Sequence, residues 1–566
     1  MYEDLGLFYE VDEVKKYYTA DFETTTDKDD LRVWAWGICD IDNVNNFQYG
    51  NTIETFIDWC YKNSGCNLYF HNLRFDGEFI LSYLLLNGYK YSKEKEDKTF
   101  NTVISGTGQF YKIEIVFKRY NSRIVSVNIY DSLKKLPFSV EEIAKSFDLP
   151  IRKEEIDYHA KREIGHILTE EEISYLRNDV EIMARALKIQ FSEDLKRMTI
   201  GADSLATFKK MLPKGYFDKL FPVLPIEIDS DIRRAYRGGY TYTNKIHQNK
   251  DIGCGLVYDV NSMYPAVMYY EDMPYGMPVP FKDRYEQDEM YPLYIQKIKI
   301  DFEIKKDHIP VIQVKKSYFY SDTEYLDRSN GDVVLYVTNI DLEVIKEQYD
   351  ILNIEYLGGW KFKKISGIFN DYIDRFMEMK KNNTGAKRLL AKLLLLNNLY
   401  GKFATNPDVT GKIPYLDEDD VVRYKLDEKE TRDPVYTPLG VFITSYARAK
   451  CQRTAQALYN RFCYADTDSI HIIGKDLPTN IEIDDKELGK WSLEGSFKRA
   501  RFLRAKTYIE EDYEGGLNVK CAGMPKSLKE HVTYDNFLTG LTLTGKLLPK
   551  KYKGGVVLES SDFTIK

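Results

Sequence analysis

The sequence has 566 residues, a formal net charge of −8, and 43% hydrophobic and 14% aromatic residues. This length exceeds what one hydrophobic core supports, and the apolar content excludes an intrinsically disordered chain, so several folded units are expected. The acidic balance argues against a protein that binds nucleic acid through its overall charge, although an acidic surface is compatible with a local basic groove.

The first third of the sequence holds four acidic residues in three predicted elements. Residues 17–25 predict a strand, on which two acids that are two residues apart point to one face. An apolar strand then leads into a predicted helix, and a second, amphipathic helix is predicted over residues 170–187. On each helix an acid follows a polar residue by one turn. The residues are Asp21 and Glu23 on the strand, Asn72 and Asp76 on the first helix, and Tyr175 and Asp179 on the second.

Four convergent carboxylates and a tyrosine are the groups with which two divalent cations could activate a water molecule and hold a scissile phosphate. Each acid alone is also compatible with a solvated charge or a helix cap, so the prediction depends on the joint pattern. Neighbouring side chains could contact the end of a single DNA strand, and one lysine could stabilise phosphate charge unless it is a plain surface lysine. The strand candidates are Thr24, His71, Asn72, Phe75, Ser132 and Leu133, and the lysine is Lys153.

A basic segment with two adjacent glycines, RRAYRGGY, covers residues 233–240. Adjacent glycines let a backbone approach a ligand closely, and arginines bind phosphates. The segment therefore predicts a DNA contact, with a Gly-Gly turn between solvated arginines as the alternative. The candidate residues are Tyr236, Arg237, Gly238 and Gly239.

Two later segments predict a second metal site. The segment LVYDVNSMYP delivers Asp259 at the end of an apolar strand, and the ring of Tyr264 would lie against the sugar of a nucleotide. The segment FCYADTDSIHI predicts a hairpin whose tip carries Asp466 and Asp468. Two acids at one turn repel each other unless a divalent cation lies between them and a phosphate, although such a tip alone would be an ordinary surface turn. We expect Asp259 and Asp468 to bind the cations and Asp466 to assist.

Eight motifs occur in the order found in the family B DNA polymerases, and the sequence resembles the protein-primed branch of that family over nearly its whole length. The motifs are DFE at 21–23, HNLRFD at 71–76, YLRND at 175–179, YRGG at 236–239, DVNSMYP at 259–265, NLYG at 398–401, YADTDS at 464–469 and KTY at 506–508. The resemblance implies a multi-domain α+β protein that synthesises DNA along a DNA template. It also implies 3′–5′ proofreading and protein-primed, strand-displacing replication of the phage type.

The resemblance further implies a domain order. An RNase H-like exonuclease domain would precede a right-hand polymerase with two insertions. The boundaries are 1–199 for the exonuclease, 200–270 and 437–524 for the palm, 271–368 for an insertion that contacts the priming protein, 369–404 for the fingers, 405–436 for an insertion that supports strand displacement and processivity, and 525–566 for the thumb. Implied ligands are primer–template DNA, dNTPs, a terminal protein, and two Mg2+ ions per active site, with Mn2+ as a substitute; the protein would be a monomer.

Residues 369–399 predict two helices that carry the nucleotide-binding lysine of the family. The family places this lysine four residues before an asparagine, but here Lys392 and Asn397 are five residues apart. On a regular helix the extra residue turns the lysine about 100° away, and a single π-helical turn would restore the alignment. If Lys392 pointed away, Lys380 and Arg388 would be the candidate phosphate contacts instead. Independently of this, Tyr400 could pack on the nascent base pair, and Gly401 would allow it to approach closely.

Two further segments carry expectations of their own. Residues 404–436, rich in turns and charge, predict solvated loops. Residues 497–509 alternate cations with aromatic residues and could follow a phosphate backbone; Lys506 and Tyr508, two apart on a strand, resemble the element that holds the primer terminus.

Two rival functions stay open on sequence alone: an exonuclease whose remaining two thirds only bind DNA, and a non-enzymatic factor that binds DNA or a terminal protein. Seven irregularly spaced cysteines predict reduced thiols. We see neither a hydrophobic leader nor an apolar run of about 18 residues, so the expectation is a host-cytoplasmic protein that is not secreted and has no membrane partner.

Overall fold

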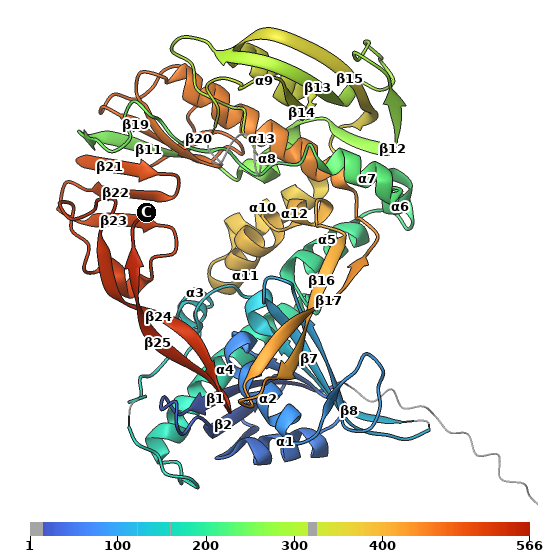
Figure 1. The fold of residues 1–566 in the computed structure, drawn as a ribbon, viewed down its shortest axis with the longest axis vertical. Helices are drawn as coiled ribbons and strands as arrows, with labels where there is room; N and C mark the ends of the chain where they lie inside the picture. The colour runs from blue at the N-terminus through green and yellow to red at the C-terminus, as the bar shows by residue number, and fades with distance from the viewer. Residues whose placement is uncertain (1–14, 122, 159, 315–324) are drawn as a thin grey trace, which may run out of the picture.

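The computed structural model describes residues 15–121, 123–158, 160–314 and 325–566. Figure 1 shows a blue N-terminal unit at the bottom, the later strands and helices arched above it, and two hairpins that descend to it from opposite sides. Among the residues so described, no helix is both long and apolar enough to cross a bilayer.

The N-terminal unit is built on an eight-stranded sheet in the order β3-β2-β1-β4-β8-β7-β6-β5. Its first strand pairs antiparallel with β2 and parallel with β4, which places the DFE segment near the middle of the sheet. The strands are β1 (Tyr17–Thr24), β2 (Val33–Asp40), β3 (Phe47–Gly50), β4 (Asn67–Phe70), β5 (Lys90–Tyr91), β6 (Thr99–Ile104), β7 (Phe110–Arg119) and β8 (Ile124–Asp131).

Helices cover both faces of this sheet. Buried side chains of α1 (Ile53–Lys62) and α2 (Leu73–Leu86) pack with one face, and those of α4 (Glu170–Ser192) pack with the other. The predicted helix over 170–187 is therefore confirmed, and it begins with a capping box at Thr169. A short 3-10 turn (Ser132–Lys134) and α3 (Val140–Ser146) connect β8 to the segment before α4.

The buried core on the α4 side continues into the rest of the molecule. One cluster of buried side chains contains Val180 of α4, Phe208 of α5 (Ile200–Met211), Tyr372 of α10 (Asn370–Asn382), Phe442 of α13 (Thr437–Ala457) and Val260 of β11 (Gly255–Val260). The N-terminal unit and the central sheet of the upper part are thus packed around a shared core.

That central sheet has five strands in the order β20-β11-β19-β18-β9. The predicted hairpin is confirmed as β18 (Phe462–Asp466) and β19 (Ser469–Ile473), and β11 pairs with β19 so that Asp259 lies opposite Ser469. The other strands are β9 (Thr241–Thr243) and β20 (Trp491–Phe497). Helix α8 (Met263–Tyr270) follows β11 directly and packs on α13.

The segment between α8 and α10 is strand-rich, as predicted. Its sheet has the order β12-β15-β13-β14 and carries α9 on it. The elements are β12 (Met273–Phe281), β13 (Leu293–Ile304), β14 (Val333–Thr338), α9 (Asn339–Gln348) and β15 (Tyr349–Ile365). Residues 315–324 of the predicted first insertion lie outside the described residues.

Helices α6 (Tyr216–Leu220) and α7 (Ile226–Arg233) follow α5, and two helices flank the predicted junction at 382–385. These are α10 and α11 (Gly385–Leu389), after which a π-helix spans Leu390–Leu396 and α12 spans Leu399–Phe403. The π-helix falls where the extra residue between Lys392 and Asn397 required it.

Two expectations about later segments are wrong. Residues 404–436 are not loops but contain a long hairpin, β16 (Asp408–Leu416) and β17 (Val422–Thr431), because apolar residues such as Val422 anchor its tip on the N-terminal core. Lys506 and Tyr508 do not share a strand: Lys506 occupies the left-handed turn (φ 58°) between β21 (Arg499–Arg504) and β22 (Thr507–Glu511).

The C-terminal region forms a second four-stranded sheet, β10-β21-β22-β23, followed by a long hairpin. Its remaining elements are β10 (Asp251–Ile252), β23 (Leu517–Cys521), α14 (Lys526–Lys529), β24 (Thr542–Tyr552) and β25 (Gly555–Thr564). All seven cysteines are free thiols, as expected.

Candidate active sites

The acids of the N-terminal unit converge where β1, α2 and α4 meet. Glu23, Asp76 and Asp179 are only 6%, 4% and 4% exposed, and Asp21 is half-buried. Tyr175 of α4 is buried one turn before Asp179. The fold therefore brings residues from three distant segments near enough for their charges to interact.

The buried carboxylates of this cluster repel one another. Burial, and then the charge of Asp179, raises the pKa of Asp21 to about 7, against an opposing effect of Lys153. Burial and the neighbouring acids likewise hold the pKa values of Glu23 and Asp76 well above their usual range. Such a cluster is stabilised by positive charge.

The donor set fits a divalent cation. The Lys153 ammonium lies 2.8 Å from Asp179 Oδ2, whereas Asp179 Oδ1 is buried and has no hydrogen-bond partner among the described residues. Buried carboxylate oxygens without a partner are the hard donors that Mg2+ or Mn2+ binds. In the described part of the chain, no three His, Cys, Asp or Glu side chains are gathered closely enough to hold a metal.

Some predicted strand contacts have other roles in the structure. Ser132 is fully buried and donates to the Phe70 carbonyl, and both ring nitrogens of His71 are taken by Ser132 Oγ (3.0 Å) and the Phe138 carbonyl (2.7 Å). Their side chains are therefore engaged inside the protein. Asn72 is exposed and precedes α2 in a left-handed conformation (φ 72°), so it does not lie on the helix with Asp76.

The remaining predicted residues of this site lie around the carboxylates. The Tyr175 hydroxyl is 2.7 Å from that of Tyr158. Thr24, Phe75 and Leu133 are half-buried. Phe75 and Asn72 line a cavity of about 420 Å³ that also borders Glu78.

The second carboxylate site lies on the central sheet. Asp259 ends β11, and the Val260 N–H donates to the Asp468 carbonyl at 2.8 Å, which brings the two acids together. Burial, and then Asp468, raises the pKa of Asp259 to about 7, and burial raises that of Asp468. The pairing of β11 with β19 thus joins two acids that are far apart in the sequence.

Asp466 and Asp468 are unequal, as expected. Asp466 accepts hydrogen bonds from Thr241 (2.9 Å) and Tyr464 (3.3 Å), and the Lys506 ammonium lies 3.5 Å away. Since these partners already occupy its oxygens, Asp466 is less free than Asp468 to bind a cation.

A further acid was missed by sequence reasoning. Glu494 of β20 lies at a bulge opposite β11, and its charge also raises the pKa of Asp259. Asp259, Glu494 and Lys392 line one cavity of about 680 Å³. Glu494 reaches Asp259 only through the pairing of β20 with β11. The surrounding sequence LEGS contains no motif that indicates an active-site acid.

The π-helix turns Lys392 toward the second site. Lys392 is exposed, lines the cavity beside Asp259, and partly offsets the rise in the pKa of that acid. Asn397 follows the π-helix and is exposed. The Lys380 ammonium is 3.4 Å from Ser262 Oγ, at the start of α8, and exposed Arg388 donates to the Lys380 carbonyl. Lys392 therefore does not point away from the acids.

Two tyrosine rings stack on each other near the second carboxylate site. The rings of Tyr264 and Tyr400 stack with centroids 3.8 Å apart. A Cβ atom added to Gly401 would meet open space, so that backbone is accessible. Both rings were predicted to contact a nucleotide, and here they contact each other.

The Gly-Gly loop packs directly on the carboxylate hairpin. A Cβ atom on Gly239 would lie 2.6 Å from Thr467 Oγ1, whereas one on Gly238 would meet nothing. The Thr467 N–H donates to the Tyr240 carbonyl at 2.7 Å. Tyr236 is half-buried beside this loop.

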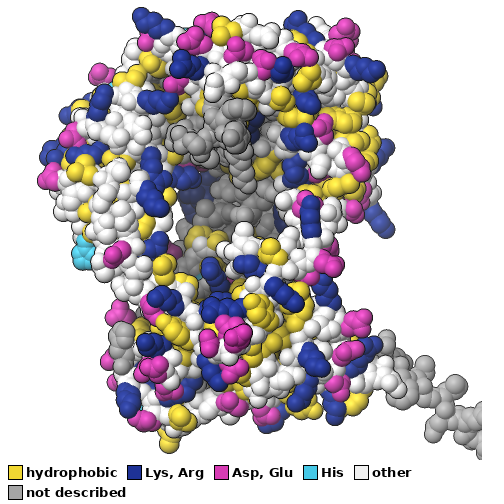
Figure 2. Space-filling model, viewed as in Figure 1, with side chains coloured by type: hydrophobic (Ala, Val, Ile, Leu, Met, Phe, Trp, Pro, Cys, Tyr) yellow, Lys and Arg dark blue, Asp and Glu magenta, His cyan; other side chains and the backbone are white. Residues whose placement is uncertain are grey.

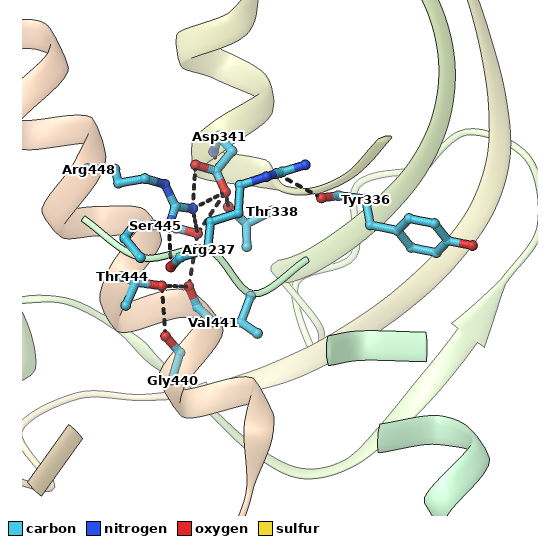
Figure 3. A network of polar contacts seen from close by, with 10 residues as sticks. Arg237, Tyr336, Thr338, Asp341, Gly440, Val441, Thr444, Ser445 and Arg448 are labelled. Carbon is cyan, nitrogen blue, oxygen red and sulfur yellow. Dashed lines mark hydrogen bonds and ion pairs between the residues drawn. The ribbon is translucent and has the colours of Figure 1, made fainter. Parts of the chain in front are cut away.

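Arg237 is directed into the protein rather than toward a ligand. Figure 3 shows Arg237 and Arg448 gathered around the Asp341 carboxylate of α9. Arg448 donates to both Asp341 oxygens (2.8 and 2.7 Å) and to the Arg237 carbonyl (2.8 Å), and Arg237 donates to the Tyr336 carbonyl (3.2 Å). Arg237 is half-buried here and its guanidinium bonds to the Tyr336 carbonyl, so its predicted phosphate contact stays a prediction.

Part of the basic segment 497–509 also has internal partners. Arg499 pairs with Glu511, and buried Arg501 pairs with Asp251 (2.6 Å). Lys506 still reaches the carboxylate hairpin through Asp466. Tyr508 is buried against Tyr464.

The protein-family model described as DNA polymerase type B, organellar and viral, matches residues 57–486. The chain belongs to this family of DNA polymerases. The polymerase is 49% identical to the DNA polymerase of Bacillus phage B103 and 48% identical to that of Bacillus phage phi29, over 98% of this chain and 100% and 99% of theirs. It is 33% identical to the DNA polymerase of Streptococcus phage Cp-1 over 97% of this chain and 98% of that one.

Comparison with solved structures supports the same family assignment as the sequence comparison. Phi29 DNA polymerase complexed with primer-template DNA and incoming nucleotide substrates matches this polymerase with a TM-score of 0.94 and 47% identity, over 98% of this chain and 100% of that chain. The predicted resemblance to family B DNA polymerases is therefore confirmed, and the relatives are phage enzymes of the phi29 type.

Replacing Asp259 by Asn is expected to stabilise the polymerase at high pH when a chelator removes divalent cations. Because the folded-state pKa is raised from 3.8 to about 7, the charged form is disfavoured in the folded protein. The resulting destabilisation of the folded protein is absent below the pKa that Asp259 has in the unfolded chain, and it is complete above pH 7. Thermal unfolding should give a higher midpoint for Asp259→Asn than for wild type near pH 8, with a difference that shrinks toward about pH 4. A lower midpoint for the variant near pH 8 would contradict this account.

Proposed function

We propose that the protein extends a DNA primer along a DNA template, using dNTPs and a pair of divalent cations. The observation that carries the proposal is the convergence of Asp259 and Asp468 beside Lys392 on a chain that matches phi29 DNA polymerase over 98% of its length. That relative is solved with primer-template DNA and incoming nucleotides, and we extend both ligands to this chain.

In this proposal Asp259 and Asp468 hold Mg2+ or Mn2+, and Asp466 assists from its hydrogen-bonded position. The bound cations would neutralise the triphosphate and favour the ionised form of the attacking hydroxyl. Lys392 places an ammonium beside the same acids, where triphosphate oxygens would lie. Tyr264 would lie against the sugar of the incoming nucleotide and Tyr400 against the nascent base pair, and the Gly238 backbone leaves room for a strand to approach.

The N-terminal carboxylates support a second activity, a 3′–5′ exonuclease that removes misplaced nucleotides. Asp21, Glu23, Asp76 and Asp179 offer oxygen donors for a separate pair of divalent cations, and the orphaned Asp179 Oδ1 is the most direct support for it. Lys153 lies beside Asp179, where it can hold phosphate charge. The predicted domain order, an exonuclease domain followed by a right-hand polymerase, fits the separate positions of the two sites.

The remaining expectations from the family resemblance are part of the same proposal. A terminal protein would prime synthesis and contact the β12–β15 segment, and the β16–β17 hairpin would support strand displacement. The enzyme would act as a monomer in the host cytoplasm, with which its seven free thiols are consistent.

Primer extension and single-strand degradation, measured on the same preparation, test this proposal against the two rivals. A polymerase with proofreading extends a primer when dNTPs are present and shortens it when they are absent. An exonuclease alone shortens the primer in both conditions, and a binding factor leaves its length unchanged.

Replacing Lys392 by Met should weaken nucleotide binding more than it slows chemistry. Loss of a charge-assisted phosphate contact is expected to raise the KM for dNTP by about tenfold or more. Steady-state extension over a range of dNTP concentrations checks this, with Lys387→Met, at an exposed position of α11, as the matched control. Equal KM values for the two variants would remove Lys392 from the triphosphate site.

A further inference from the structure

Two hairpins from distant parts of the sequence meet on the N-terminal unit. Figure 1 shows β16–β17 and β24–β25 converging from opposite sides of the molecule onto α2. Val422 of β17 and Val556 and Val557 of β25 belong to the same buried cluster as Phe79 of α2. Figure 2 shows a hollow above this meeting point, with Lys and Arg side chains along its border.

One carboxylate connects all three segments. Glu78 of α2 is only 4% exposed, and its Oε2 accepts a hydrogen bond from the Tyr424 hydroxyl of β17 at 3.0 Å. Its Oε1 lies 2.7 Å from the Lys551 ammonium of β24. That ammonium also lies over the Tyr424 ring, 3.8 Å from its centroid. Each of the three side chains therefore contacts both of the others.

A second ion pair joins the two hairpins farther out. Lys553 lies 2.7 Å from Asp420, but both side chains are largely exposed, at 64% and 45%. Exposed pairs contribute little because water and salt screen them. Removing one partner of a buried pair is much more damaging, because it leaves an uncompensated charge away from water. Of the two ion pairs, the one at Glu78 therefore contributes more to holding the hairpin tips together.

We propose that Glu78, Tyr424 and Lys551 form a clasp that holds the two hairpin tips on α2 and so keeps the molecule closed around DNA. The proposal rests on the polymerase function proposed above, because the basic hollow then receives the DNA on which the protein moves. Release of DNA requires the tips to separate, and the clasp opposes that separation. Glu78 is thus a positioning residue for processive synthesis and takes no part in nucleotide transfer.

The experiment measures product length after a single binding event, with excess unlabelled DNA as a trap, on a primed single-stranded circle. Glu78→Gln and Lys551→Met should shorten the products by about fivefold or more, while insertion of a single nucleotide stays at the wild-type rate. Tyr424→Phe removes one hydrogen bond and keeps the ring, so it should have a smaller effect. Lys553→Met, on the neighbouring turn, should leave product length unchanged.

A charge-swapped variant separates the clasp from a general loss of folding. Glu78→Lys combined with Lys551→Glu should recover much of the product length that either change alone removes, because opposite charges again face each other. Wild-type product lengths for Glu78→Gln, no recovery in the swapped variant, or equal shortening by Lys553→Met would each overturn the clasp. Absence of any extension by the wild-type protein would instead refute the proposed function.

Discussion

Asp468→Ala is expected to abolish primer extension while the degradation of single strands continues. Asp468 lies on the hairpin that pairs with β11, beside Asp259, and its charge is part of the reason why the pKa of Asp259 is raised. Without it the site loses a carboxylate that would hold the cations, and the loss should be on the order of 10³-fold in the rate of incorporation. Single-turnover extension of a labelled primer measures it.

Two comparisons sharpen this result. Asp466→Asn should be less harmful than Asp468→Asn, because Thr241, Tyr464 and Lys506 already hold Asp466. Asp476→Ala, at an exposed position just after β19, serves as the control and should extend normally. If Asp468→Ala also stopped degradation, the two activities would share one site, and the separation proposed here would be wrong.

Asp21→Ala is expected to have the opposite effect. Degradation of a single strand should fall by about 10³-fold or more, because the cluster loses a carboxylate that would hold a cation, whereas extension of a matched primer should proceed at the wild-type rate. The single-strand degradation assay and the primer extension assay measure these two rates. Asp58→Ala, an exposed acid of α1 paired with Lys62, is the matched control.

A second readout ties the loss at Asp21 to the cluster itself. The variant should also be more stable than wild type in chelator near pH 8, because it lacks an acid whose pKa is raised to about 7. Unchanged degradation would show that Asp21 takes no part in this activity.

The acids proposed for each site could be predicted because their signals are local. A strand with acids at alternate positions, a helix with an acid one turn after a tyrosine, and a hairpin with a polar tip each restrict the backbone within a few residues. The register of the lysine helix was predictable for the same reason, since one additional residue in a helix has few ways to be accommodated.

Residues brought in by pairing between distant segments could not be predicted. Glu494 lies beside Asp259 only because β20 pairs with β11, and the Arg237 side chain is held by the Tyr336 carbonyl of β14, which lies in another sheet. The β16–β17 hairpin was mistaken for loops because its charged, turn-rich sequence obscures the few apolar residues that anchor its tip. In each case the decisive partner is hundreds of residues away or on another sheet.

The shared core has a mechanical consequence for the two proposed sites. Because α4, which carries Asp179, packs in the same buried cluster as β11, which carries Asp259, the two reaction centres cannot swing relative to each other without opening close-packed side chains. We therefore expect the protein to stay rigid while the unpaired end of the primer strand moves between the two proposed sites. Two spectroscopic labels, one on α1 and one on α13, should keep a constant separation whether the bound primer is matched or mismatched.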